Sequence, residues 1–367
     1  MPPDRSPRDR PLADKIALVA GATRGTGRGI AVALGEAGAT VYCSGRSVRG
    51  NPATAGRPET VEETAELVTA RGGKGIPVQT DHTALEQVRA LTERIHAEAG
   101  RLDILVNDVW GGDELTQWER PLWEHSLEKG LLMQQRAVHS HIITSRYAIP
   151  LMLDRTGALI VEVTDGVGPR YRGNVYYDLA KVSAIRLAAA LAYELRNRGV
   201  SAVAVTPGFL RSEAMLERFG VTEETWRDHI ARDPYWAESE TPMFVGRCVA
   251  ALAADPRHWE HSGEALASWN LAEIYGIDDI DGRRPHWGRH IDAALDDAWA
   301  KLATMTTSAL ASRTPPVPVT ADRAALTIRA GRARRQVLEP ELVFMALEAI
   351  RDELIAQLDR AAADDAR

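Results

Sequence analysis

The sequence predicts a doubly wound α/β fold, in which a parallel sheet of about seven strands carries helices on both faces and a helical extension follows at the C-terminal end. Two observations predict it. Short apolar runs alternate with longer amphipathic runs from residue 15 onward, and strands separated by such helical segments form right-handed crossovers in a parallel sheet. A glycine-rich turn, 20–27, also directly follows the first apolar run and opens a helix.

The elements are assigned in order along the chain. Strands are predicted for runs rich in Ile, Val and Leu: 16–20, 40–44, 75–79, 103–107, 159–163, a run ending before Pro207, and 263–269. Helices are predicted for amphipathic runs: 25–37, 59–71, 85–99, one opening near 175, and 242–254. Ligands of such a sheet bind at the carboxyl ends of its strands, so the residues that follow the strands are the candidate site.

Length and composition limit the class of protein. The chain has 367 residues, 45% hydrophobic and 26% charged, enough for one large α/β core and an appendage. A net charge of −7 argues against nucleic acid or an anionic membrane as a partner. Cys43 and Cys248 are too few for a disulfide framework, so we expect a reducing, cytoplasmic location.

Shifts in composition predict the domain organisation. The first dozen residues are charged and proline-rich, which indicates a mobile leader without the apolar core of a signal peptide. Near the C-terminus one apolar helical stripe packs onto its own domain, a sister subunit or another protein: Val343, Leu347, Ile350, Leu354 and Leu358. The predicted parts are 1–12 (leader), 13–290 (main domain), 291–320 (helix and proline-rich linker) and 321–367 (helical extension).

Tyr177, Lys181 and Thr164 form the outline of a reaction centre. Tyr177 and Lys181 are four residues apart at the start of a predicted helix, so their side chains lie on one face. The ammonium favours the ionised phenol, which makes the pair a general acid suited to a carbonyl. Tyr176 points about 100° away around the helix and is assigned to pocket lining or packing. Thr164 follows the run 159–163, where its hydroxyl can bond a substrate oxygen.

The glycines of the first turn, Gly21, Gly25 and Gly27, permit a tight bend. They let backbone N–H groups approach a pyrophosphate at the positive end of the helix dipole. A βα turn without a ligand is the alternative. The second strand ends at Gly45, where an enzyme that prefers NAD usually has an acidic residue at the ribose.

Two arginines indicate which dinucleotide binds. Arg24 lies in the glycine turn and Arg46 follows the second strand. Two guanidinium groups converging where a carboxylate is missing suit the 2′-phosphate of NADP(H), which they can bind through paired hydrogen bonds. The alternative is that either arginine is merely a solvated surface residue.

The spacing GxxxGxG at 21–27 and YxxxK at 177–181 together resemble the short-chain dehydrogenase/reductase family. The resemblance spans roughly 12–285 and implies a Rossmann-type fold and a homodimer or homotetramer. It implies that Tyr177 protonates the substrate oxygen, Lys181 bonds the nicotinamide ribose, and Thr164, usually Ser in the family, polarises the carbonyl. We place Phe209 against the nicotinamide. The other cofactor positions are Thr23, Thr26, Ser47, Asp81 at the adenine amine, His82, Asn107, Pro207, Gly208, and Ser212 at the carboxamide.

Several positions depart from the family pattern. Asp108 replaces the second Asn of the family's NNAG motif. The family's helix before the fifth strand carries an Asn that joins the Lys to a water chain. Counting from Trp123 places Glu128 or Lys129 there, so Glu128 either replaces this relay or the relay is broken. Asp165, if buried beside Thr164, opposes Lys181 by raising the pKa of the tyrosine.

The family resemblance places a substrate lid at about 210–242. Its aromatic residues indicate either a bulky apolar or aromatic ligand or a packed core. We assign Trp110, Asp165 and Tyr171 to the substrate pocket, with Trp110 narrowing it. The aromatic residues weighed for the pocket are Phe219, Trp226, Tyr235, Trp236, Trp110, Trp118, Trp123 and Tyr171.

No metal site is predicted. The segment IDDIDG, 277–282, places its carboxylates at the wrong positions for a calcium loop. His286 and His290 have i, i+4 spacing, yet no acidic residue follows the first of them as a zinc-protease motif requires.

The function expected from these residues is an NADPH-dependent reductase acting on a ketone or related carbonyl. One rival keeps the fold and cofactor but reduces an imine or enone, or runs a non-redox step with Asp165 or Glu128 as acid or base. The other rival is a non-catalytic scaffold that holds NADP(H) and signals through its tail.

Overall fold

The computed structural model describes residues 10–311, except 55, 119, 154–155 and 169, together with 350–352 and 355–356. They belong to two compact units. One comprises the chain up to 168 together with 179–287, and the other comprises 170–178 and the described residues from 288 onward. The predicted leader therefore lies almost wholly outside the described residues.

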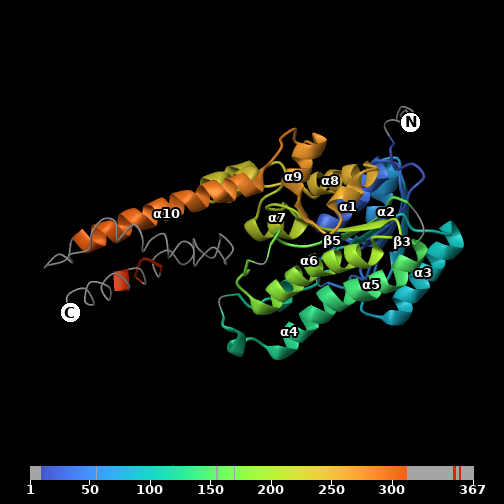
Figure 1. Cartoon of the computed structure of the whole chain (residues 1–367), viewed down its shortest axis with the longest axis horizontal. Coiled ribbons are helices and arrows are strands. Elements are labelled where there is room, and N and C mark those ends of the chain that lie inside the picture. The colour runs from blue at the N-terminus through green and yellow to red at the C-terminus, as the bar shows by residue number, and fades with distance from the viewer. Residues whose placement is uncertain are drawn as a thin grey trace. The chain divides into compact units, whose positions relative to one another are not determined.

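The first unit contains a parallel seven-stranded sheet in the order β3-β2-β1-β4-β5-β6-β7 (Figure 1). The strand order reverses direction between β1 and β4, because β2 and β3 lie on one side of β1 and β4 to β7 lie on the other. A ligand crevice is therefore expected at the carboxyl ends of β1 and β4. The predicted doubly wound fold is confirmed. The strands are β1 (Ile16–Ala20), β2 (Thr40–Gly45), β3 (Lys74–Gln79), β4 (Ile104–Asn107), β5 (Ala158–Val163), β6 (Val200–Thr206) and β7 (Ala265–Ala267).

Helices cover both faces of this sheet. Buried side chains of α1, α2, α8 and α9 pack on one face, and those of α3, α5 and α6 pack on the other. The helices, some of which Figure 1 labels, are α1 (Gly25–Glu36), α2 (Val61–Ala70), α3 (Leu85–Ala99), α4 (Leu127–Gln134), α5 (Ser140–Ala148), α6 (Val175–Leu195), α7 (Glu213–Phe219), α8 (Pro242–Ala254), α9 (Ser268–Tyr275) and α10 (Trp287–Ala311).

Two glycines set the close approach of α1 and α8. A Cβ on Gly29 would lie 2.0 Å from the Pro242 carbonyl oxygen, and a Cβ on Gly246 would lie 2.4 Å from the Gly29 oxygen. No real side chain tolerates such distances, so the two backbones touch directly. This contact holds α1, whose first turn follows the glycine-rich bend, directly against α8.

The long helix before β5 was placed by the family resemblance and not by its own pattern. It consists of α4, a π-helical turn at Gln135–His139, and α5. Its buried face carries polar residues, Ser140, His141, Thr144 and Ser145, and this weakens the periodicity by which a helix is read from sequence.

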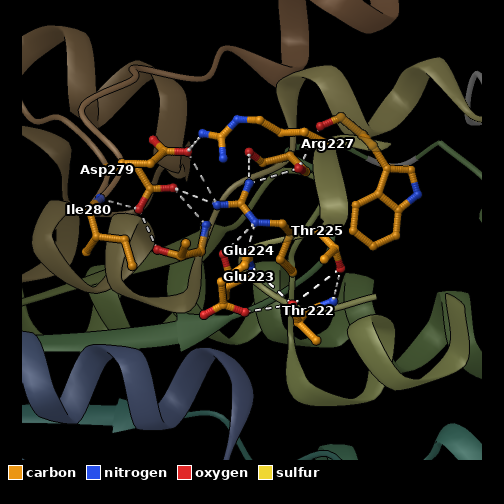
Figure 2. Close-up of polar contacts among 12 residues, drawn as sticks. Thr222, Glu223, Glu224, Thr225, Arg227, Asp279 and Ile280 are labelled. Carbon is orange, nitrogen blue, oxygen red and sulfur yellow. Dashed lines mark hydrogen bonds and ion pairs between the residues drawn. The ribbon is translucent and has the colours of Figure 1, made fainter. Parts of the chain in front are cut away.

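The predicted lid segment, 210–242, is organised around the fully buried side chain of Arg211. Its guanidinium donates to Ser239 O and Oγ at 2.7 and 2.9 Å and to the Glu223 carboxylate at 3.2 Å, and lies 3.7 Å from Asp279. Figure 2 shows Glu223 and Asp279 approaching this network from different segments. Three guanidinium groups contact the Trp226 ring. Their Cζ atoms lie 4.2, 4.5 and 4.8 Å from the ring centroid in Arg211, Arg227 and Arg283.

The second unit contains the start of α6 and most of α10. Arg172 is buried and pairs with Asp178 at 2.9 Å. Ile291, Ala298 and Leu302 are buried on α10. The helical C-terminal region that was predicted is present, and Ile350 of the predicted stripe is buried. The other members of that stripe, Val343, Leu347, Leu354 and Leu358, lie outside the described residues.

Within the part of the chain that the structure describes, every helix is too short or too polar to cross a lipid bilayer.

Candidate active site

The glycine turn between β1 and α1 brings three stretches of backbone together. Gly21 has φ +91°, and a Cβ there would lie 2.3 Å from Asp108 O, at the end of β4. A Cβ on Gly27 would lie 2.4 Å from Gly21 O. Gly25, with φ +57°, has open space, because its nearest neighbour would be 3.9 Å away. The turn is therefore closed on the sheet side and open above Gly25.

The first turn of α1 lacks its own anionic cap. Arg24 at the N-cap position makes no side-chain capping bond, and the first turn contains no acidic residue. The N–H of Gly25 donates instead to Glu213 Oε2 at 2.8 Å, from the first residue of α7. A helix N-terminus whose N–H is met only by a carboxylate from a distant segment, beside an open glycine, is a site suited to an anion such as a phosphate.

The two arginines assigned to a 2′-phosphate turn to different neighbours. Arg24 Nη2 donates to Thr54 Oγ1 at 3.2 Å, whereas Arg46 Nη2 lies 3.4 Å from the place of a Cβ on Gly111. Arg136, which sequence reasoning missed, reaches the same glycine and donates to Gly111 O at 2.9 Å. β2 ends at Gly45, where a Cβ would lie 2.6 Å from Thr23 Oγ1. No acidic side chain stands at that position.

Several residues predicted to bind the cofactor have side chains that bond or pack within the protein. Ser47 is buried and its Oγ accepts from Ala53 N at 3.1 Å. Asp81 accepts two bonds from Thr83, which with the charge of Arg46 outweigh burial and lower its pKa. Thr26 is buried in the first turn of α1.

The His82 ring is buried and both of its nitrogens are bonded within the protein. It is buried between Ser44 Oγ, at 2.9 Å, and Thr144 Oγ1, at 2.8 Å. Burial, followed by the charge of His141, lowers its pKa to about 3, so the ring is neutral. The predicted role of His82 in cofactor binding stays a prediction, and its ring is bonded to Ser44 and Thr144.

A buried polar network lies beneath the end of β4. Asn107 Nδ2 donates to Glu162 Oε1 at 2.8 Å and to Ser145 Oγ at 3.0 Å. The second oxygen of Glu162 lies 2.6 Å from His141 Nδ1, and His141 Nε2 lies 3.1 Å from Val109 O. Sequence reasoning missed Glu162 because it sits inside an apolar strand run, where a lone carboxylate gives no pattern.

Asp108, which departs from the family motif, lies between the glycine turn and Lys181. Its carboxylate accepts the Gly27 N–H, and it is held in the electrostatic field of Lys181 and His141. Desolvation outweighs these favourable contacts and raises the pKa of Asp108 to about 7.

Thr164 and Lys181 are joined directly. Thr164 is buried at the end of β5, and its hydroxyl donates to Lys181 O at 2.7 Å. The Lys181 ammonium lies over the Trp110 indole, with Nζ 4.2 Å from the ring centroid. Trp110 Nε1 donates to Asp113 at 2.6 Å, which fixes the ring that faces the lysine.

Tyr177 lies in the first turn of α6, in the second unit. Asn174 precedes the helix and its Oδ1 accepts from Tyr177 N at 3.0 Å, which is an N-capping bond. Lys181 follows on the same helix, one turn later. Asn174 was missed, although Asn immediately before a helical run is a capping signal. Tyr171 of the same unit is half-buried, and burial followed by the charge of Asp178 raises its pKa.

The turn after β6 is held by a buried glutamate that sequence reasoning missed. Gly208 N donates to Glu240 Oε2 at 2.9 Å, and Thr206 Oγ1 donates to Pro207 O at 2.9 Å. Ser212 caps α7 by accepting from Met215 N at 3.3 Å.

The predicted position of Phe209 against a nicotinamide stays a prediction, and the structure shows which protein rings Phe209 contacts. Its ring packs against Trp236 and Trp287, with centroids 5.3 and 5.5 Å away. Phe209 therefore belongs to an aromatic cluster of the lid.

Glu128 and Asp165 are both exposed, and only for Asp165 had burial been considered. Glu128 is exposed in the first turn of α4, near a helix start capped by Ser126. Asp165 is exposed as well. The suggestion that a buried Asp165 perturbs the tyrosine was wrong on this point, and the relay role of Glu128 stays an untested prediction.

The aromatic residues weighed for a substrate pocket divide between core and surface. Trp226 and Trp236 are fully buried within the lid, whereas Trp118 and Trp123 are exposed by 47% and 85%. The core alternative holds for the first pair. Of the residues assigned to the substrate pocket, Trp110 lies beside Lys181, and the pocket roles of Trp110, Asp165 and Tyr171 stay predictions.

Comparisons with known proteins agree with this geometry. A family model described as short chain dehydrogenase matches residues 15–219. Dehydrogenase/reductase SDR family member 1 of Mus musculus is 36% identical over 278 residues, covering 74% of this chain and 85% of that protein. The 3-oxoacyl-[acyl-carrier-protein] reductase FabG of Staphylococcus aureus is 30% identical over 202 residues, covering 54% and 76%. A short chain dehydrogenase structure from Mycobacterium thermoresistibile shares the fold, with TM-score 0.63, 21% identity, and coverage of 76% and 92%.

The chain belongs to the short-chain dehydrogenase/reductase family, a family of oxidoreductases that use a nicotinamide cofactor. Within the family it falls in the subgroup of dehydrogenase/reductase SDR family member 1. The glycine turn fits such a cofactor, because it is open at Gly25 and leads into a helix without an N-cap of its own.

Proposed function

We propose that the protein is an NADP(H)-dependent reductase of a ketone or related carbonyl. The observation that carries the proposal is the placement of Tyr177 and Lys181 one turn apart on α6, a helix capped by Asn174. A phenol and an ammonium on one helical face form an acid whose proton can be delivered to a substrate oxygen.

Each residue has a defined part in this chemistry. The nicotinamide would supply the hydride when bound. Tyr177 gives its proton to the substrate oxygen, and Lys181 stabilises the ionised phenol and bonds the nicotinamide ribose. Trp110 holds the lysine ammonium by a cation–π contact, which limits its orientations. Thr164 polarises the substrate carbonyl after its hydroxyl turns away from Lys181 O.

The preference for NADP(H) rests on charge at the end of β2. Gly45 supplies no carboxylate to a ribose hydroxyl, and Arg24 and Arg46 each lie in the adjoining loops. Arg136 adds a third positive charge beside Gly111. A 2′-phosphate is stabilised by such guanidinium groups, whereas NAD gains nothing from them.

A bulky carbonyl substrate is proposed from two sources. Trp110 places an indole beside Lys181, which gives an apolar wall to the reaction centre. The relatives from Staphylococcus aureus are named for reduction of a 3-oxoacyl group, which is a ketone. We extend only the ketone class to this chain.

One observation favours the non-catalytic alternative. The Thr164 hydroxyl, which a reductase needs as a donor, is used within the protein to bond Lys181 O. A protein that only holds NADP(H) is consistent with that bond.

Turnover separates the two functions. NADPH consumption is measured against a panel of bulky ketones, 3-oxoacyl thioesters, imines and enones, with bound NADPH followed separately by its fluorescence. The reductase consumes NADPH with at least one ketone. Tyr177→Phe abolishes that turnover and leaves NADPH affinity nearly unchanged, because the hydroxyl acts on the substrate. Binding without any turnover supports the scaffold, and retained turnover in Tyr177→Phe removes the tyrosine from its role.

A homodimer or homotetramer is proposed from the helices on one face of the sheet. Large apolar side chains there are exposed by 49% to 69% and would be covered by a second copy. They are Leu127, Leu131, Ile142, Leu179 and Tyr193. Light scattering on the purified chain gives its mass in solution, and a monomeric mass contradicts this proposal.

A further inference from the structure

The lid helix α7 places a carboxylate on the glycine turn. Glu213, the first residue of α7, accepts a hydrogen bond from Gly25 N at 2.8 Å, and its other oxygen lies 3.9 Å from Arg28 Nε. The two partners of the bond are 188 residues apart in the chain. The negative charge of Glu213 thus occupies the positive end of α1, which has neither a capping side chain nor an acidic residue of its own.

A second carboxylate of α7 makes a similar contact one turn later. Glu217 pairs with Arg57, in the loop between β2 and α2, and Arg57 also lies 3.5 Å from Glu59. The Arg57 side chain is only 13% exposed, and its Nη2 is buried without a hydrogen-bond partner among the described residues. The same loop contains Thr54, which accepts from Arg24. Glu217 therefore lies on the loop beside the arginines assigned to the 2′-phosphate.

The apolar contact that holds α7 in the lid is at its last residue, Phe219, whose ring packs edge-on against Trp236 and His229 with centroids 5.3 and 5.2 Å away. None of its seven residues is buried. It begins next to the buried Arg211 and ends at Gly220, which has φ +64° and open space around it. Because Phe219 lies at the opposite end of α7 from Glu213, a movement of Glu213 and Glu217 that keeps the Phe219 ring contacts costs chiefly the two carboxylate contacts.

We propose that α7 is an anionic latch, in which Glu213 and Glu217 compete with the phosphates of the dinucleotide for the glycine turn and for Arg57. This inference rests on the proposed binding of NADP(H). It adds that α7 sets the affinity of the protein for that cofactor. Binding of the cofactor displaces Glu213 from Gly25 N and moves α7, and release of the cofactor lets α7 return. The latch lowers cofactor affinity by the free energy of its own contacts.

Neutral variants of the two glutamates test the latch through cofactor affinity. Glu213→Gln is expected to lower the NADPH dissociation constant by about 3- to 30-fold, since it removes a charge at a helix N-terminus and a charge-assisted bond. Glu217→Gln is expected to lower it by about 2- to 5-fold, because the Glu217 side chain is 70% exposed although Arg57 is not. Inorganic pyrophosphate, used as a competitor, is expected to bind more tightly to Glu213→Gln as well.

The matched control is Glu224→Gln, an exposed lid glutamate that accepts from Thr222 and does not touch the glycine turn. It leaves NADPH affinity unchanged. Equal or weaker NADPH binding by both Glu213→Gln and Glu213→Ala, with folding verified by circular dichroism, overturns the latch. If the Gln variants bind NADPH more tightly but turn over no carbonyl, the latch is supported and the proposed reaction is contradicted. If neither the wild type nor the double Gln variant binds NADPH or NADH, the cofactor and the latch both fail.

Discussion

The hydroxyl of Thr164 donates to the main-chain oxygen of Lys181 over 2.7 Å, so the end of β5 is tied to the first turns of α6. The family usually has Ser at this position, and the extra methyl of Thr restricts rotation about χ1. A hydroxyl that bonds Lys181 O must turn before it can donate to a substrate. The proposed reaction would therefore require this internal hydrogen bond to break first.

Thr164→Ser and Thr164→Val test this dependence. Ser keeps the donor and rotates freely, so we expect kcat/KM with a responding ketone to equal or exceed that of the wild type. Val removes the donor, and we expect a loss of about 10²- to 10³-fold, the usual effect of deleting one oxyanion-stabilising donor. NADPH affinity is the control and stays constant in both. Full activity in Thr164→Val excludes the hydroxyl from the reaction.

Arg46→Asp is expected to shift cofactor preference toward NADH. The change replaces an attraction for the 2′-phosphate with a repulsion, and the ratio of kcat/KM for NADPH over NADH is expected to fall by about 10- to 100-fold. Arg46→Gln is the matched control that only removes the attraction and gives a smaller fall. An unchanged ratio in both variants means that Arg46 does not contact the phosphate.

The sheet and the glycine turn could be predicted because their signals are local. Apolar runs bounded by turn residues mark strands wherever they lie. The glycines of the first turn mark a bend in which a side chain at 21 or 27 would clash and Gly25 has a positive φ. Lys181 and Tyr177 share a helix, so their spacing alone places them on one face.

The contacts that define the rest of the site are long-range, and no local pattern encodes them. Glu213 meets Gly25 across 188 residues, and His82 meets Thr144 across 62. The burial of Asp165 was considered only from its neighbour in the sequence. The exposure of a side chain depends on which residues pack against it, and Asp165 is exposed. Phe209 was placed by its position after β6, but its ring follows the aromatic residues of the lid.

Removing Arg211 is expected to unfold the lid. Arg211→Met keeps much of the side-chain volume but leaves the carboxylates of Asp279 and Glu223 facing each other without their cation. Breaking a buried ion network in this way costs about 3–5 kcal/mol of unfolding free energy, measured by urea denaturation. Arg227→Met is the control, since Arg227 also stacks on Trp226 but is half exposed; it costs less than about 1 kcal/mol. Equal effects contradict the central role of Arg211.

Because the pKa of Glu240 is raised, we expect the free energy of unfolding to depend on pH between about 4.5 and about 8. Burial raises its pKa from 4.5 to about 8, against the lowering effect of its bonds from Ser268 and Gly208. Between these two values the folded chain keeps a proton that the unfolded chain has lost. Each pH unit in that window therefore lowers this group's contribution to the unfolding free energy by up to about 1.4 kcal/mol, and the fall levels off above pH 8.

Glu240→Gln removes this dependence, because an amide does not titrate. Unfolding free energies measured at several pH values between 5 and 9 are expected to show the wild type losing stability relative to Glu240→Gln as pH rises toward about 8. Glu264→Gln is the control, since that carboxylate is exposed by 55% and its removal shifts the profile little. Parallel profiles for the wild type and Glu240→Gln would show that the buried carboxyl has an ordinary pKa and that the Gly208 turn is held by a charged group.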